Sequence, residues 1–203
     1  MLISESDKKR ITATIAAAEL KTAGEIFCVI ARQSGDYRLV PIVWAAFAAL
    51  LLPLPLILFT GLTTHWIYIA QLAVFAVITL ALSIDAVRFR IVPRRRMQEQ
   101  AHAEAVRQFC AQGLHKTENR TGVLIFASEA EHYAEVIADA GINEKVPPAV
   151  WHDAVAALIA EIAQGRAADG FVAAVEKCGT VLAQHFPPGT LNRNELPDKM
   201  IEI

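Results

Sequence analysis

The sequence predicts an α/β fold, a small central sheet flanked by helices on both faces, into which a two-helix transmembrane hairpin is inserted. Two observations carry this prediction. Residues 39–84 contain no Asp, Glu, Lys or Arg, although charged residues make up 20% of the 203-residue chain. On each side of that segment lies a continuous apolar run of strand length, Glu25–Ala31 and Thr121–Ala127, as expected for strands covered on both faces. Helical periodicity flanks both runs, so we expect the elements before and after the hairpin to complete one core.

The first part of the soluble domain is predicted over residues 1–36. Apolar positions spaced i, i+3, i+4 and i+7 predict a helix over Asp7–Lys21, namely Ile11, Thr14, Ile15 and Ala18. Ser4 or Ser6 is suited to cap its start. Thr22, Ala23 and Gly24 end this helix, and the strand Glu25–Ala31 follows directly.

The hairpin is predicted over residues 39–84, with spans at 39–59 and 66–84. As helices, the two spans would be about 31 and 28 Å long, close to the ~30 Å thickness of a hydrocarbon core. Arg32 and Arg38 precede the first span and five arginines follow the second, whereas the connector Thr60–His65 has no Lys or Arg. The positive-inside rule therefore predicts cytoplasmic termini. The spans hold no ionisable residue that would mark an ion route, so we interpret them as an anchor, with a kink expected at Pro53 and Pro55.

The second part of the soluble domain is predicted over residues 88–186, and a flexible tail over 187–203. Helical spacing predicts a helix over Met97–Gln112 with Ala101, Ala105, Val106, Phe109 and Cys110 facing inward. The strand Thr121–Ala127 comes next, then a third strand over His132–Asp139 that should run antiparallel to it. Two more helices are predicted after a loop framed by Gly141 and Pro147-Pro148, one from Trp151 to Gly165 and one through Phe171 and Leu182.

Charge and cysteine content limit the functional classes. Residues 97–203 contain 8 Lys and Arg against 15 Asp and Glu, a balance of −7, which disfavours nucleic acid as a partner. Five arginines crowd into Arg88–Arg96, and their place after an apolar span favours anionic lipid headgroups. The three cysteines lie far apart without a C-x-x-C motif, so we expect reduced, buried thiols.

Residues that could carry chemistry are few. The sequence contains none of the standard nucleotide-binding, hydrolase or zinc-protease motifs. Asp139, Glu144 and Asp153 could converge as oxygen ligands for a divalent cation (Mg, Ca or Mn), with His132 and His152 as further donors; the alternative is solvated surface acids. Four arginines form a second candidate set, for binding a phosphate or a lipid headgroup: Arg94, Arg95, Arg96 and Arg120. For Arg120 the alternative is a salt bridge.

Three stretches resemble the TPM domain, and in particular its membrane-embedded branch: Arg120–Phe126, Glu131-His132-Tyr133 and Ala138–Val146. The resemblance continues through Asp169-Gly170-Phe171 and His185-Phe186-Pro187. It implies an α/β/α domain, and an acid phosphatase activity and divalent-metal binding have been associated with some relatives. Arg120-Thr121-Gly122 departs from the Asp-Asn-Gly entry to the strand found in those relatives.

These observations favour a non-catalytic binding or assembly module, anchored in the cell (inner) membrane by two spans, with both termini and the soluble domain in the cytoplasm. The alternative is a divalent-metal-dependent, phosphatase-like hydrolase in which Asp139, Glu144 and Asp153 hold the metal. The expected partners are the lipid bilayer and either another membrane protein or a second copy of the chain, and not nucleic acid.

Overall fold

The computed structural model describes residues 3–188 and 195–203, which fall into two compact units. One unit comprises the chain up to Ser34 and from Gln98 onward; the other is Gly35–Met97. The elements of the first unit are α1 (Glu5–Glu19), β1 (Glu25–Ala31), η1 (Leu114–Lys116), β2 (Gly122–Ser128), β3 (Tyr133–Ala138), α7 (Ala140–Asn143), η2 (Pro148–Trp151), α8 (His152–Ile162), α9 (Ala167–His185) and β4 (Met200–Glu202). Those of the second are α2 (Leu39–Leu51), α3 (Pro53–Phe59), α4 (Thr64–Leu82) and α5 (Asp85–Ile91). Helix α6 (Arg94–Ala111) begins in the second unit and ends in the first.

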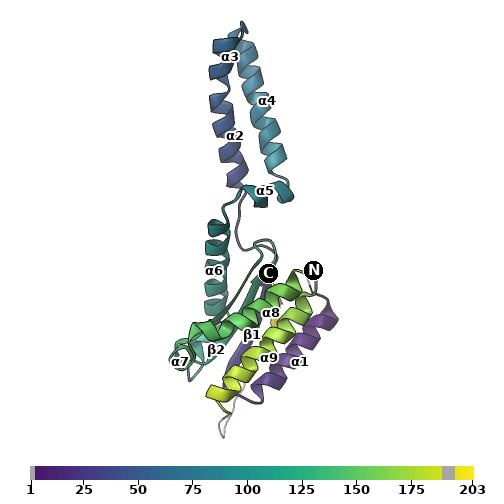
Figure 1. The fold of residues 1–203 in the computed structure, drawn as a ribbon, viewed down its shortest axis with the longest axis vertical. Helices are drawn as coiled ribbons and strands as arrows, with labels where there is room; N and C mark the ends of the chain where they lie inside the picture. The colour runs from purple at the N-terminus through teal and green to yellow at the C-terminus, as the bar shows by residue number, and fades with distance from the viewer. Residues whose placement is uncertain (1–2, 189–194) are drawn as a thin grey trace. The chain divides into compact units, whose positions relative to one another are not determined.

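A four-stranded mixed sheet in the order β3-β2-β1-β4 forms the centre of the first unit (Figure 1). Strand β1 runs parallel to β2 along its whole length, from Glu25 opposite Gly122 to Ala31 opposite Ser128. Strand β3 is antiparallel to β2, as the sequence predicts. The chain between the parallel strands β1 and β2 contains the whole second unit, so the hairpin lies inside the crossover connection of the sheet.

Alternating side chains of β1 and β2 build two hydrophobic cores, one on each face of the sheet. Ile26, Cys28 and Ile30 lie on the face covered by α1, α8 and α9, where Ile15, Leu158 and Phe171 are fully buried. Phe27 and Val29 lie on the opposite face and pack with Ala101, Ala105 and Phe109 of α6. Because both faces are covered, every residue of β1 and β2 is buried, which explains their uninterrupted apolar sequence. The predicted fold class is confirmed.

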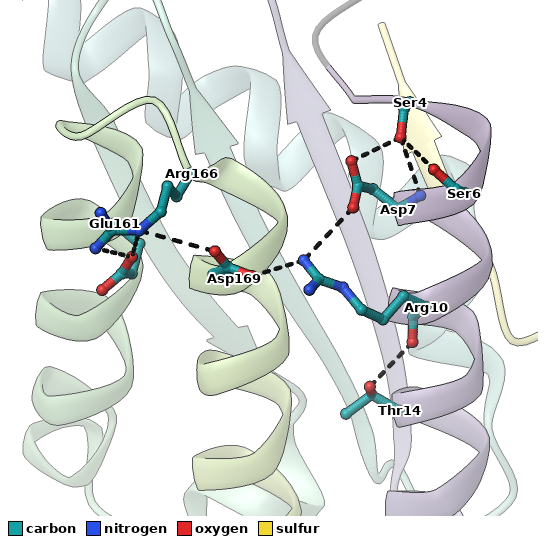
Figure 2. A network of polar contacts seen from close by, with 8 residues as sticks. All are labelled: Ser4, Ser6, Asp7, Arg10, Thr14, Glu161, Arg166 and Asp169. Carbon is teal, nitrogen blue, oxygen red and sulfur yellow. Dashed lines mark hydrogen bonds and ion pairs between the residues drawn. The ribbon is translucent and has the colours of Figure 1, made fainter.

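A polar network on the surface links the helices that cover one face of the sheet, α1, α8 and α9 (Figure 2). Ser4 caps α1 by accepting a hydrogen bond from the backbone N–H of Asp7, 3.1 Å away. One turn later, Arg10 forms ion pairs with Asp7 (3.5 Å) and with Asp169 of α9 (2.7 Å). Arg10 and Asp169 are 49% and 45% exposed, so water screens this pair and it orients α1 against α9 more than it stabilises the fold.

Two predictions about the soluble unit are wrong. The tail predicted to be flexible over residues 187–203 contains β4, whose Met200 is buried and pairs with Cys28 of β1; residues 189–194 of that tail lie outside the described part. Cys110, predicted to be buried, is exposed, whereas Cys28 and Cys178 are buried as expected. Successive helical positions differ by about 100°, so the face of α6 centred on Ala101, Ala105 and Phe109 turns Cys110 toward solvent.

The second unit is a hairpin of two apolar helical segments. Leu39–Phe59 has 21 residues and Thr64–Leu82 has 19, and each is long and apolar enough to cross a membrane. The first segment consists of α2 and α3, which meet at Leu52 immediately before Pro53. Proline has no N–H and its ring crowds the preceding turn, which accounts for the break where a kink was predicted.

Most of the surface of the hairpin is formed by apolar side chains. Ala45 and Ala49 are buried in the hairpin, whereas large residues point outward, including Trp44 (54% exposed) and Phe47 (57% exposed). At the base of the hairpin, where α2 begins and α4 ends, the rings of Tyr37 and Phe89 pack edge to face, with their centroids 5.7 Å apart.

Candidate functional site

Two of the residues singled out from the sequence, Arg120 and Asp139, meet at one corner of the sheet, where β3 ends beside the start of β2. Antiparallel pairing brings these ends together, and the backbone N–H of Asp139 donates to the carbonyl of Gly122 at 2.9 Å. Arg120 lies two residues before β2 with φ of 55°, a left-handed conformation uncommon for a residue with a side chain. Its guanidinium Nε and Nη2 donate to the two carboxylate oxygens of Asp139, at 2.7 and 2.9 Å. The pair is therefore bidentate, which fixes both side chains.

Asp139 is 5% exposed and has two structural roles. Its carboxylate pairs with Arg120 and also accepts a hydrogen bond from the backbone N–H of Ala140 at 2.7 Å, capping α7. Burial acts to raise the pKa of Asp139, but the bonds from Arg120 and Ala140, with the positive charges of Arg120 and His115, outweigh it. The pKa is held below its usual value, and the carboxylate is ionised at neutral pH.

Gly141 allows the two segments of the corner to touch. A Cβ atom at this position would lie 2.4 Å from the carbonyl oxygen of Asn119 and 2.8 Å from that of Arg120, both of which are backbone atoms. The residues before β2 can therefore rest directly on α7 only because position 141 has no side chain.

Neighbouring hydroxyl groups are also used to hold the corner. The side chain of Thr117 donates to the carbonyl of Leu114 and accepts from the backbone N–H of Thr121. The hydroxyl of Thr121 donates to the carbonyl of Ala23, next to β1. These hydrogen bonds fix the corner and hold the guanidinium of Arg120 at the surface, where the side chain is 56% exposed. An exposed guanidinium can contact an anion. The ion pair of Arg120 with Asp139 corresponds to the salt bridge given as the alternative role of Arg120 in the sequence analysis.

The other predicted metal ligands lie in different surroundings from Asp139. Glu144, at the end of α7, and Asp153, in the first turn of α8, are both exposed, as are His132 and His152. Across residues 3–188 and 195–203, no group of three or more His, Cys, Asp or Glu side chains is arranged to hold a metal ion. The predicted metal site is therefore not supported by the geometry.

The remaining candidate arginines form the first turn of α6. Arg94, Arg95 and Arg96 are exposed and follow α5 after a short break. They belong to the same unit as the hairpin, and nearby Arg88 stacks over the ring of Phe89 at 5.3 Å. Cations therefore gather near the base of the hairpin, where α2 begins and α4 ends.

Sequence reasoning missed a buried hydrogen-bonded cluster at the other end of β1 and β2. The carboxylate of Glu131, 6% exposed, accepts from the hydroxyl of Ser128 and from the backbone N–H of Ser34, and the two serine hydroxyls lie 2.8 Å apart. This cluster fixes the point where the chain leaves the sheet toward the hairpin. Ser34 and Glu131 are 97 positions apart, so no local pattern connects them.

Comparison with known proteins agrees with the fold and with the stretches between Arg120 and Phe171 that carry the resemblance. Residues 83–181 match the family model described as the TPM domain. The chain contains a TPM domain. The match begins after the hairpin, although α1 and β1, which precede it, complete the same sheet and core.

One solved structure supports the fold. The BA42 protein of the psychrophilic bacterium Bizionia argentinensis, determined by NMR, aligns with a TM-score of 0.62 over 99% of this chain and 95% of that one. Its sequence identity to this chain is 18%, so the likeness concerns the fold alone. No curated protein matches the sequence.

Proposed function

We propose that this chain is an integral membrane protein that presents its TPM domain at the cytoplasmic face of the cell membrane as a non-catalytic binding or assembly module. The observation that carries the proposal is the position of the hairpin within the fold. It interrupts the connection between two paired parallel strands, so the domain is tethered to the hairpin on both sides of the insertion.

The surface of the hairpin supports insertion into lipid. Its outward side chains are large and apolar on both helices, and none of the residues from Leu39 to Ile84 is Asp, Glu, Lys or Arg. Exposing such a surface to water would oppose folding, whereas lipid solvates it, and the helical backbone satisfies its own hydrogen bonds.

The arginines near the base of the hairpin support the orientation. Arg94, Arg95 and Arg96 follow the second helix, and the connector at the other end has no Lys or Arg. On this proposal the three side chains contact the phosphates of anionic lipids on the cytoplasmic side. Replacing all three by Gln should reduce the anionic lipid that copurifies with the protein in a zwitterionic detergent, while Arg107→Gln, farther along α6, should not.

The use of the acidic groups supports a non-catalytic role. Asp139 is paired with Arg120, and Glu131 accepts from Ser128 and Ser34, so these two buried carboxylates hold segments of the fold together. Glu144 and Asp153 are exposed on separate elements. A hydrolase would need a metal or a nucleophile arranged beside such groups.

Turnover by the purified full-length protein tests this part of the proposal. In nanodiscs, with a phosphate monoester and with Mg²⁺, Ca²⁺ or Mn²⁺ supplied in turn, we expect no hydrolysis above the background of an empty-nanodisc preparation. Hydrolysis that disappears in Glu144→Ala or Asp153→Ala would contradict the proposal and support the metal-dependent hydrolase. Hydrolysis unchanged in both variants would be traced to a contaminating enzyme if a second purification by a different tag removed it, and would contradict the proposal if it persisted.

A further inference from the structure

Five arginines lie within nine residues at the base of the hairpin. Two are in the last turn of α5 and three are in the first turn of α6: Arg88, Arg90, Arg94, Arg95 and Arg96. The residues between them are uncharged, so this stretch, which we call the arginine platform, carries five positive charges and no acidic residue. The whole platform belongs to the same compact unit as the hairpin, and α5 follows directly on α4 (Figure 1).

Aromatic residues hold the α5 part of the platform in place. The ring of Phe89 packs edge to face against Tyr37, which is buried at the point where the chain enters α2. On the same ring lies the guanidinium of Arg88, 5.3 Å from the ring centroid. Because its neighbour Phe89 is packed, α5 is fixed to the hairpin, and the exposed Arg90 in its last turn is fixed with it.

The bend between α5 and α6 is also fixed. Val92 is buried, and its extended backbone (φ −74°, ψ 127°) ends α5. Helix α6 then starts with the backbone N–H of Met97, which donates to the carbonyl of Pro93 at 3.2 Å. The Cα atoms of Arg90 and Arg94, on the two sides of this bend, are at most about 14 Å apart, since four residues reach no farther. The two groups of arginines therefore keep one arrangement close to each other.

The charges of the platform are unfavourable where they stand. The first turn of α6 contains three cations and no acidic residue, whereas a helix dipole favours acidic side chains at that end. Within the part of the chain whose side chains the structure describes, Arg90, Arg94 and Arg96 form no ion pair. Proteins keep such local conflicts mainly at functional sites. A bound anion would relieve both the repulsion between the arginines and the conflict with the helix dipole.

We propose that the arginine platform binds a membrane lipid whose headgroup carries two phosphate groups. Each guanidinium can donate to two oxygens of one phosphate, so the cations on the two sides of the bend can share two phosphates. A lipid with one phosphate leaves most of the platform uncompensated. A second phosphate in the same molecule is bound at a high effective concentration once the first is in place. This inference rests on the proposed insertion of the hairpin into the membrane, and it names the lipid that the arginines select.

Apolar residues beside the platform favour a lipid over a soluble diphosphate. Leu39, at the start of α2, is 72% exposed, and Ile84, just after α4, is 58% exposed. Both lie at the base of the hairpin, next to the segment that carries the arginines. A lipid bound through its phosphates would cover these side chains with its acyl chains, whereas a soluble anion would leave them in water.

Native mass spectrometry of the delipidated full-length protein in a zwitterionic detergent tests this selection. The probes are tetraoleoyl cardiolipin, with two phosphates, and dioleoylphosphatidylglycerol, with one, compared at equal phosphate concentration. We expect one cardiolipin per protein, bound at least about tenfold more tightly than phosphatidylglycerol. The double variant Arg90→Gln, Arg94→Gln should lose this preference, whereas Lys177→Gln, which removes an exposed cation on α9, should keep it.

The outcomes separate this inference from the proposed function. Equal affinity for the two lipids, or a cardiolipin preference that persists in the double variant, overturns the inference and leaves the anchoring role standing. Binding of neither lipid contradicts the contact with anionic lipids as well. Inorganic pyrophosphate alone should bind at least about tenfold more weakly than cardiolipin, because it has no acyl chains, and equal binding would overturn the assignment to a lipid. If the double variant does not fold, Arg90→Gln alone should still weaken cardiolipin binding, and an unchanged affinity would overturn the inference.

Discussion

Replacing Gly141 with alanine sets two effects of opposite sign against each other. Alanine favours helix over glycine by up to about 1 kcal/mol, and less in a helix as short as α7. The added Cβ would lie 2.4 Å from the carbonyl oxygen of Asn119 and 2.8 Å from that of Arg120, and these backbone atoms cannot rotate away as a side chain would. Overpacking of this kind costs about 1–3 kcal/mol, so we expect a net loss of about 1–2 kcal/mol.

Urea unfolding of the full-length protein in nanodiscs measures this loss. The chain has three tryptophans, and replacing Trp44 and Trp66 of the hairpin by Phe leaves Trp151, which is 4% exposed in the soluble unit, as the only reporter. With a slope of about 2 kcal/mol per molar urea, the unfolding midpoint should fall by roughly 0.5–1 M in Gly141→Ala. Gly61→Ala, where nothing lies within 4 Å of the added atom, should leave it unchanged. A midpoint for Gly141→Ala equal to or above that of the parent protein would refute the tight contact at the corner.

The same assay checks two further predictions. Asp139→Ala removes the cap of α7 and should cost about 1 kcal/mol, whereas Glu144→Ala should change stability by less than about 0.5 kcal/mol; equal effects would contradict the structural role of the buried carboxylate. Because the pKa of Asp139 is lowered in the fold, its stabilising effect is present above the ordinary pKa near 3.8 and is lost as pH falls below it, so the difference between Asp139→Ala and parent should shrink in acid. Glu131→Ala leaves a buried hydroxyl and a backbone N–H without their acceptor and should cost about 1–3 kcal/mol, and a cost below 0.5 kcal/mol would show that water replaces the carboxylate.

The elements that sequence analysis located are those whose signal lies in one continuous stretch. Glu25–Ala31 and Thr121–Ala127 are apolar throughout because helices cover both faces of the sheet, and the strands β1 and β2 correspond to these runs within one residue. The hairpin is visible for a similar reason, since the exposed side chains along its two spans are predominantly apolar, as are its internal ones. In both cases every side of the element is in an apolar environment, so the segment can be located from continuous hydrophobicity without a helical or strand period.

The features that were missed depend on partners distant in the sequence. Strand β4 has three residues, too few for an alternating pattern, and exists because β1 supplies an edge some 170 positions earlier. The ion pair between Arg120 and Asp139 requires the antiparallel register of β2 and β3, which residue spacing does not specify. For this reason Asp139 could be selected as a notable acid, but its ion pair with Arg120 could not be predicted.

Labelling of the native Cys110 tests the membrane orientation most directly. This thiol is exposed on α6, whereas Cys28 and Cys178 are buried, so a membrane-impermeant maleimide has one accessible native target among the described residues. The reference is Thr63→Cys, in the connector between the two spans, combined with Cys110→Ser. In intact spheroplasts we expect the connector cysteine to react and Cys110 to stay unlabelled until the membrane is permeabilised. Labelling of Cys110 in intact spheroplasts, with protection of the connector cysteine, would place the TPM domain outside the cell and contradict the proposed topology.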